Sequence, residues 1–131
     1  MPSETSMLYT EAQAMEEYLS GANEVVSQIT WEDHHPYYPK QIEDLMLFIA
    51  KSSWVFGDYR KHKLPEVMGK VESANIEQVK CALTTINRSE KWVTGSWKTH
   101  LEQNSLEPLI KRAIMLTEPK SFLQKLNPFS K

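Results

Sequence analysis

The stretch Asn75-Ile-Glu-Gln-Val-Lys-Cys-Ala-Leu-Thr-Thr-Ile-Asn87 predicts an amphipathic helix and is the strongest indication of the fold class. Asn75 followed three residues later by Gln78 fits a capping box, in which the side chain of each residue accepts a hydrogen bond from the backbone N–H of the other. Apolar residues recur at the spacing of one helix face, at Ile76, Val79, Ala82, Leu83 and Ile86. The segment therefore predicts a helix with one buried face.

Helical periodicity continues on both sides of this segment. We expect helices from about Glu11 to Ile29, from Pro39 to near Ser52, from Leu64 to Val71, from Gly95 or Ser96 through Leu101, from Leu106 to Thr117, and a short one after Pro119 with Phe122, Leu123 and Leu126 on one side. No window alternates apolar and polar residues with the period of a strand. The fold class is therefore expected to be all-α, a single compact bundle of about five to seven helices.

The 131 residues correspond to one ordinary domain, and 40% of them are hydrophobic, which is enough for a core without disulfides. Residues 1–9 are polar and lack periodicity, so they are expected to be flexible. The predicted helical domain spans residues 10–126. Residues 127–131 are expected to be flexible as well.

A cytoplasmic location is expected from the cysteine usage and from the N-terminal sequence. Cys81 is the only cysteine and cannot form an internal disulfide. No basic segment followed by an apolar run opens the chain, as it would in a secretory signal. The longest apolar run is Leu45 to Ala50, far short of the roughly 20 residues that cross a bilayer, so no membrane association is expected.

The net charge of -2 conceals a strong division along the chain. Residues 1–58 carry a net charge of -8, and residues 59–131 carry +6. Acidic and basic helices that pack side by side would explain this division. The alternative is a basic face for a polyanion or an acidic face for a basic partner, and packing within the domain is the interpretation we favour.

The connector between the first two predicted helices contains Glu32-Asp33-His34-His35, whose side chains are of the types that bind transition metals. Adjacent side chains on an extended connector point in opposite directions, so at most two of them could reach one ion. A site would need His62, His100 or a distant carboxylate as well. We therefore expect a solvated connector, with no metal and no cofactor.

Cys81 is the only cysteine nucleophile in the sequence, and it lies in the middle of the helix predicted over 75–87. A buried cysteine is more often a core residue than a catalyst. The four glycines lie far apart, so the sequence contains no phosphate-binding loop. The sequence thus favours a protein without catalytic residues.

A charged junction follows that helix, where Arg88, Glu90, Lys91 and Trp92 precede Gly95. One interpretation is structural: Arg88 and Glu90 form ion pairs and caps, Trp92 fills the core, and Gly95 adopts a backbone conformation that other residues resist. The alternative is functional. It makes Arg88, Glu90, Lys91 and Trp92 the floor of a binding cleft.

The segment Ala82 to Gly95, with the helix Leu106 to Met115 after it, resembles a family of small bacterial and phage proteins called domain of unknown function 6508. The family pattern is an apolar helix, then Arg-x-Glu-Arg-Phe-x-x-Gly, then a helix rich in Leu and Arg. Upstream, residues 36–42 (Pro-Tyr-Tyr-Pro-Lys-Gln-Ile) resemble the segment that opens the second helix of the family. The resemblance covers roughly residues 30–115. It implies a helical cytoplasmic fold and a prokaryotic or phage origin.

The sequence departs from this pattern at three places. Lys91 replaces an arginine, Trp92 replaces a phenylalanine, and Asn104-Ser105 replaces a glycine. Lysine lacks the bidentate fork of arginine, so recognition of carboxylate or phosphate at Lys91 would be weaker. The family implies no activity.

The leading functional hypothesis is a non-enzymatic helical module that regulates another protein by binding it. Trp and Tyr beside Arg and Lys are typical of binding hot spots. The predicted binding residues are Tyr37, Tyr38, Trp54, Tyr59, Arg60, Lys61 and Lys63. A phage origin would suit an inhibitor of a host defence complex, of the anti-CRISPR type, by analogy of size and origin.

Two other hypotheses stay open. The basic half could bind nucleic acid, with Arg60, Lys61, Lys63, Arg88, Lys91 and Lys98 on phosphates. The chain could also be a small hydrolase that uses His34 or His35 with Glu32 or Glu90. A homodimer is plausible because the second predicted helix is apolar on most of its surface.

Overall fold

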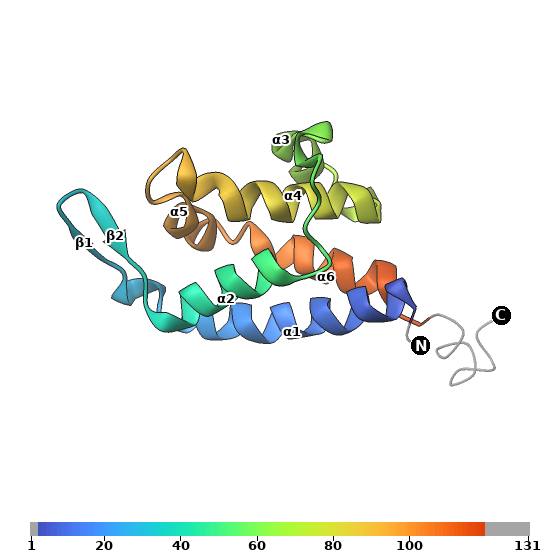
Figure 1. Ribbon diagram of the computed structural model, residues 1–131, viewed down its shortest axis with the longest axis horizontal. Coiled ribbons are helices and arrows are strands. Elements are labelled where there is room, and N and C mark those ends of the chain that lie inside the picture. Colours follow the sequence, from blue (N-terminus) through green and yellow to red (C-terminus); the bar gives the residue numbers. More distant parts are fainter. Residues whose placement is uncertain (1–2, 120–131) are drawn as a thin grey trace.

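The computed structural model describes residues 3–119, which form a mostly helical fold (Figure 1). Six α-helices in this part of the chain confirm the expected fold class. The helices are α1 (Glu4–Glu24), α2 (Lys40–Lys51), α3 (Leu64–Met68), α4 (Ile76–Arg88), α5 (Ser96–Glu102) and α6 (Leu106–Thr117). Single 3-10 turns are η1 (Val26–Gln28), η2 (Tyr59–Lys61), η3 (Val71–Ser73) and η4 (Ser89–Lys91). One small hairpin is formed by β1 (Thr30–Glu32) and β2 (His35–Tyr37).

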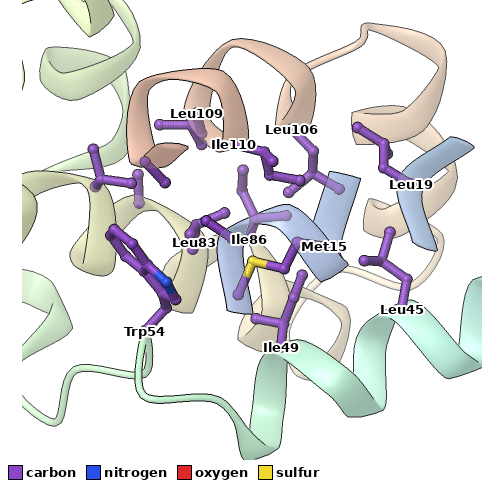
Figure 2. Packing of buried hydrophobic residues seen from close by; sticks show 14 of the residues in the cluster. Met15, Leu19, Leu45, Ile49, Trp54, Leu83, Ile86, Leu106, Leu109 and Ile110 are labelled. Atoms are coloured by element: carbon purple, nitrogen blue, oxygen red, sulfur yellow. The ribbon is translucent and has the colours of Figure 1, made fainter. Parts of the chain in front are cut away.

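The long helices pack around one core. Helix α1 lies along α6 and α2, while α4 packs against α2, α6 and the short helix α3 (Figure 1). Figure 2 shows Met15 of α1, Ile49 of α2, Leu83 of α4 and Leu109 of α6 pointing into the same interior. Each of these four side chains is fully buried. The bundle therefore holds together by burial of one apolar face from each long helix.

Helix α1 starts earlier than the sequence predicted. Ser3 caps it, because the Ser3 side chain accepts a hydrogen bond from the backbone N–H of Ser6 at 3.0 Å. Leu8 is buried in the core, and its carbonyl accepts the indole N–H of Trp54 at 2.9 Å. The prediction that residues 1–9 are flexible is therefore wrong for residues 4–9, which are the first turns of α1.

The predicted end of this helix at Ile29 is also wrong. Helix α1 ends at Glu24, and the chain then forms η1 and the β1–β2 hairpin, in which Thr30 pairs with Tyr37 and Glu32 with His35. The two residues at the tip, Asp33 and His34, have φ of 50° and 66°. Positive φ at both central residues is the geometry of the two-residue turns that close hairpins. The connector expected to be extended is thus a tight hairpin.

The strongest helix signal is confirmed. The Asn75 side chain accepts from the backbone N–H of Gln78, and the Gln78 side chain accepts from that of Asn75, both at 2.8 Å. Helix α6 has the predicted bounds, Leu106–Thr117. The helix predicted from Leu64 to Val71 is split into α3 and η3.

The short helix predicted after Pro119 and the flexible segment predicted over 127–131 lie outside the described residues. Within residues 3–119, none of the helices combines the length and apolar character needed to cross a membrane.

Candidate functional site

Trp54 was expected to bind a partner, and this prediction is wrong. Its side chain is fully buried, and its indole N–H is bonded to the carbonyl of Leu8. Figure 2 shows the ring among the buried side chains of the core. Trp54 therefore joins the segment after α2 to the first turns of α1, and none of its surface is available to a partner.

Tyr38 and Glu90 form a structural anchor. The Glu90 carboxylate accepts hydrogen bonds from the Tyr38 hydroxyl at 3.0 Å, the backbone N–H of Gly95 at 2.6 Å and the backbone N–H of Trp97 at 2.9 Å. Desolvation by burial, together with the Glu90 carboxylate, raises the pKa of Tyr38 well above its usual value. Glu90 therefore caps the start of α5, as the structural interpretation of the junction predicted.

Gly95 has φ +85°, in the left-handed region that glycine favours. A Cβ atom built on Gly95 would lie 2.7 Å from the ring of Trp31, a residue of β1. The hairpin is thus held against the start of α5 by close contact between an indole ring and bare backbone. The predicted special conformation of Gly95 is confirmed, and the close contact with Trp31 is a feature that the sequence did not indicate.

Other expectations for this junction are wrong. Trp92 does not fill the core, because 54% of its surface is exposed. No ion pair joins Arg88 to Glu90 within residues 3–119. The two side chains instead make different contacts: Glu90 caps α5, and Arg88 lies over aromatic rings.

Tyr59, Arg60, Arg88 and Trp92 come together on the surface, and we call these four residues the aromatic–arginine cluster. The rings of Tyr59 and Trp92 are stacked, with centroids 6.3 Å apart and planes 27° apart. The Arg88 guanidinium lies 5.2 Å from the centre of the Tyr59 ring, and that of Arg60 lies 5.5 Å from it. Both guanidiniums are also within 6.0 Å of the Trp92 ring. The negative faces of the rings therefore hold two cations close together.

The two arginines of the cluster have no carboxylate partner within residues 3–119. The neighbouring Lys61 differs, since it pairs with Glu77 at 3.0 Å. Desolvation opposes ionisation of Tyr59, but the guanidiniums of Arg88 and Arg60 outweigh it and hold the pKa of Tyr59 below its ordinary value. The cluster is thus electropositive.

A groove of about 570 Å³ lies beside the cluster. It is lined by residues of η2, the link from η2 to α3, the start of α3, α4 and the turn after η4, namely Tyr59, Arg60, His62, Lys63, Leu64, Pro65, Thr85 and Trp92. The lining is mostly apolar, and Lys63 adds an exposed ammonium group. His62 is hydrogen-bonded to Glu77 at 3.0 Å. The groove therefore combines an apolar floor with cationic walls.

The remaining candidate residues lie outside the aromatic–arginine cluster. Tyr37 is 56% exposed on the hairpin, and Lys91 is exposed at η4 next to Trp92. Lys61 lies next to the cluster but is paired with Glu77. Cys81 is buried in α4, where desolvation raises the pKa of its thiol. In the part of the chain that the structure describes, no three His, Cys, Asp or Glu side chains are arranged to hold a metal ion.

Searches of protein-family models, curated proteins and solved structures found no match to this chain. The resemblance to domain of unknown function 6508 therefore stays a prediction.

The sequence predicted Tyr59 and Arg60 among the partner-binding residues and Arg88 and Trp92 in a separate possible cleft. It did not indicate that they meet, because more than 25 residues separate Arg60 from Arg88. The packing of η2 against α4 brings them together. Leu64, Pro65 and Thr85 were missed as site residues, since nothing in their local sequence distinguishes them from ordinary helix residues.

Proposed function

We propose that this chain is a non-enzymatic binding module that regulates another protein, and that the aromatic–arginine cluster is its contact surface. The observation that carries this proposal is the stack of the half-buried Tyr59 ring on the exposed Trp92 ring, with the guanidiniums of Arg60 and Arg88 within 6.0 Å of both ring centres. Trp, Tyr and Arg are the residues that most often dominate binding energy at protein interfaces. An exposed tryptophan also gains more than most side chains when a partner covers it.

Two groups that an enzyme could use, the Glu90 carboxylate and the Cys81 thiol, are engaged or buried in the fold, which supports a role without chemistry. Glu90 is committed to the start of α5 by two backbone N–H groups and the Tyr38 hydroxyl. Cys81 is buried, and the raised pKa of its thiol keeps it protonated. A regulatory role against a host defence complex rests on the resemblance described above and on the size of the chain.

Site-specific photo-cross-linking in cells of the source organism tests this proposal. A photoreactive phenylalanine analogue replaces Trp92, and in a parallel strain it replaces Tyr18, an exposed aromatic residue of α1. We expect a discrete cross-linked protein from position 92 and none of that size from position 18. Proteins cross-linked equally from both positions would refute the contact surface.

A charge-reversal pair provides the matched control for this experiment. Arg60→Glu with Arg88→Glu should abolish the cross-link from position 92. Lys51→Glu with Lys70→Glu makes the same change in net charge at exposed lysines outside the cluster and should leave it. Equal loss in both pairs would mean that overall charge, and not the cluster, controls binding.

Nucleic-acid binding is the second candidate, favoured by the stacked rings beside Arg60, Lys63, Arg88 and Lys91. Stacking platforms flanked by cations bind single-stranded nucleic acids. This alternative predicts that nuclease treatment removes the cross-linked species and that binding weakens steeply with salt. A nuclease-resistant cross-linked protein would exclude it as the basis of the cross-link.

A further inference from the structure

The groove beside the aromatic–arginine cluster has a chemistry that indicates the kind of partner segment. Its floor contains Leu64, Pro65 and the aromatic rings, while Arg60 and Lys63 line the same groove. An apolar side chain would remove floor surface from water, and carboxylates on either side of it would meet the cations. A lone anion would leave the floor uncovered, and a purely apolar segment would leave the guanidiniums without a partner.

Charge within the cluster supports an acidic occupant. Arg60 and Arg88 are both held near the Tyr59 ring, so two like charges are concentrated on one small surface. Among residues 3–119 neither arginine has a carboxylate partner, although the adjacent Lys61 and His62 share Glu77. A carboxylate from outside would reduce the repulsion between the guanidiniums and could accept a bidentate hydrogen bond from either.

We propose that the groove between η2, α3 and α4 binds a short acidic peptide segment of the partner protein, with one apolar side chain seated against Leu64, Pro65 and Trp92. Carboxylates on both sides of that side chain contact Arg60, Arg88 and Lys63. This inference rests on the proposed protein-binding function and specifies its ligand. Recognition requires both features of the segment, the acidic residues and the apolar anchor.

Three labelled synthetic peptides test the requirement. The first has the sequence Asp-Glu-Asp-Leu-Phe-Asp-Glu-Asp, the second replaces Leu-Phe with Ser-Ser, and the third replaces every acidic residue with the matching amide. We expect fluorescence anisotropy to detect binding of the first to the full chain, at least about tenfold weaker binding of the second, and weaker binding of the third that varies little with salt.

Variants of the protein locate the binding. Thr85→Glu places a carboxylate in the groove and should weaken the first peptide by about tenfold or more. Lys63→Glu tests the same groove at an exposed position, so it stays informative if Thr85→Glu is unstable. Arg60→Gln with Arg88→Gln should reduce binding similarly, whereas Lys51→Gln with Lys70→Gln should not.

The outcomes separate this inference from the function on which it rests. If the serine peptide binds as well as the first peptide, the apolar anchor is wrong while acidic recognition by the cluster stands. If no peptide binds but position 92 still cross-links a protein in cells, the proposed function stands and the ligand assigned here is overturned. If a single-stranded oligothymidine binds in place of the first peptide with the same sensitivity to Arg60 and Arg88, both proposals are overturned in favour of nucleic-acid binding.

Discussion

Replacing Glu90 tests whether one carboxylate holds the junction between α4, α5 and the segment before α2. Glu90→Ala removes the acceptor of three hydrogen bonds, from the Tyr38 hydroxyl and from the backbone N–H groups of Gly95 and Trp97. A hydrogen bond to a charged group contributes about 1.5–3 kcal/mol when it is buried. Glu90 is only half-buried and water can replace part of the loss, so we expect a destabilisation of about 3 kcal/mol in total.

Glu90→Gln should have an intermediate effect, because the amide keeps one acceptor oxygen. That oxygen can still serve Tyr38 and Trp97, but the amide nitrogen then faces the N–H of Gly95, so a donor meets a donor. We expect a loss of about 1.5 kcal/mol for this variant. Tyr38→Phe leaves the two bonds from Gly95 and Trp97 to Glu90 in place but removes the long bond from the backbone N–H of Lys98 to the Tyr38 hydroxyl, and it should cost about 1 kcal/mol.

Urea denaturation followed by far-ultraviolet circular dichroism measures these differences, with an unchanged denaturant slope as the check that the variants unfold from the same compact state. At about 4 °C per kcal/mol for a domain of this size, Glu90→Ala should also lower the melting temperature by about 12 °C. The proposed role of Glu90 is refuted if the free energy of unfolding of Glu90→Ala lies within about 0.5 kcal/mol of the parent value, or if Glu90→Gln is as stable as the parent.

Three further predictions concern the same core and junction. Gly95→Ala should destabilise the folded state by about 2 kcal/mol, since the φ of Gly95 is +85° and the added Cβ would meet Trp31. In a Trp31→Ala background the cost of Gly95→Ala should fall to about 1 kcal/mol. An equal cost in both backgrounds would exclude the steric contribution of Trp31. The pKa of Tyr38 is raised in the folded state, so the stability that this residue contributes is fully present below the unfolded pKa of 10.0 and is lost as the pH rises above that value. The free energy of unfolding should therefore change less between about pH 9 and about pH 11 in Tyr38→Phe than in the parent. An identical change in the two proteins would contradict this role of Tyr38. Trp54→Phe should lower the free energy of unfolding, measured by urea denaturation, by about 3 kcal/mol, because the variant loses both buried volume and the hydrogen bond to the Leu8 carbonyl. A loss below about 1 kcal/mol would mean that the neighbouring side chains relax to fill the space.

Local signals in the sequence were sufficient for some elements and insufficient for others. The capping box of α4 and the apolar stripe of α6 depend on residues three or four positions apart, so sequence periodicity predicted both helices. The start of α1 was missed because residues 3–6 are polar, and of the adjacent Met7, Leu8 and Tyr9 only Leu8 is buried. The carbonyl of Leu8 is bonded to Trp54, 46 residues away, a contact that local sequence does not indicate.

The hairpin was missed for a related reason. Its turn residues, Asp33 and His34, are not the Asn-Gly or Asp-Gly pair that usually marks a two-residue turn. With three residues in each strand, neither strand is long enough to show alternation. Contact of Trp31 with Gly95 holds the hairpin against α5, and that contact spans more than 60 residues of sequence.

The sequence by itself determined that the chain folds as helices around one core, because helix periodicity and caps are local properties of the backbone and of neighbouring side chains. It also supplied the residue types of the candidate site. Only the tertiary structure decided which aromatic residues face solvent: Trp54, predicted to bind a partner, is buried, and Trp92, which the structural interpretation of the junction placed in the core, is exposed. The physical reason is that burial and the meeting of Arg60 with Arg88 depend on contacts between segments that are distant in the sequence, such as Trp54 with Leu8 and η2 with α4.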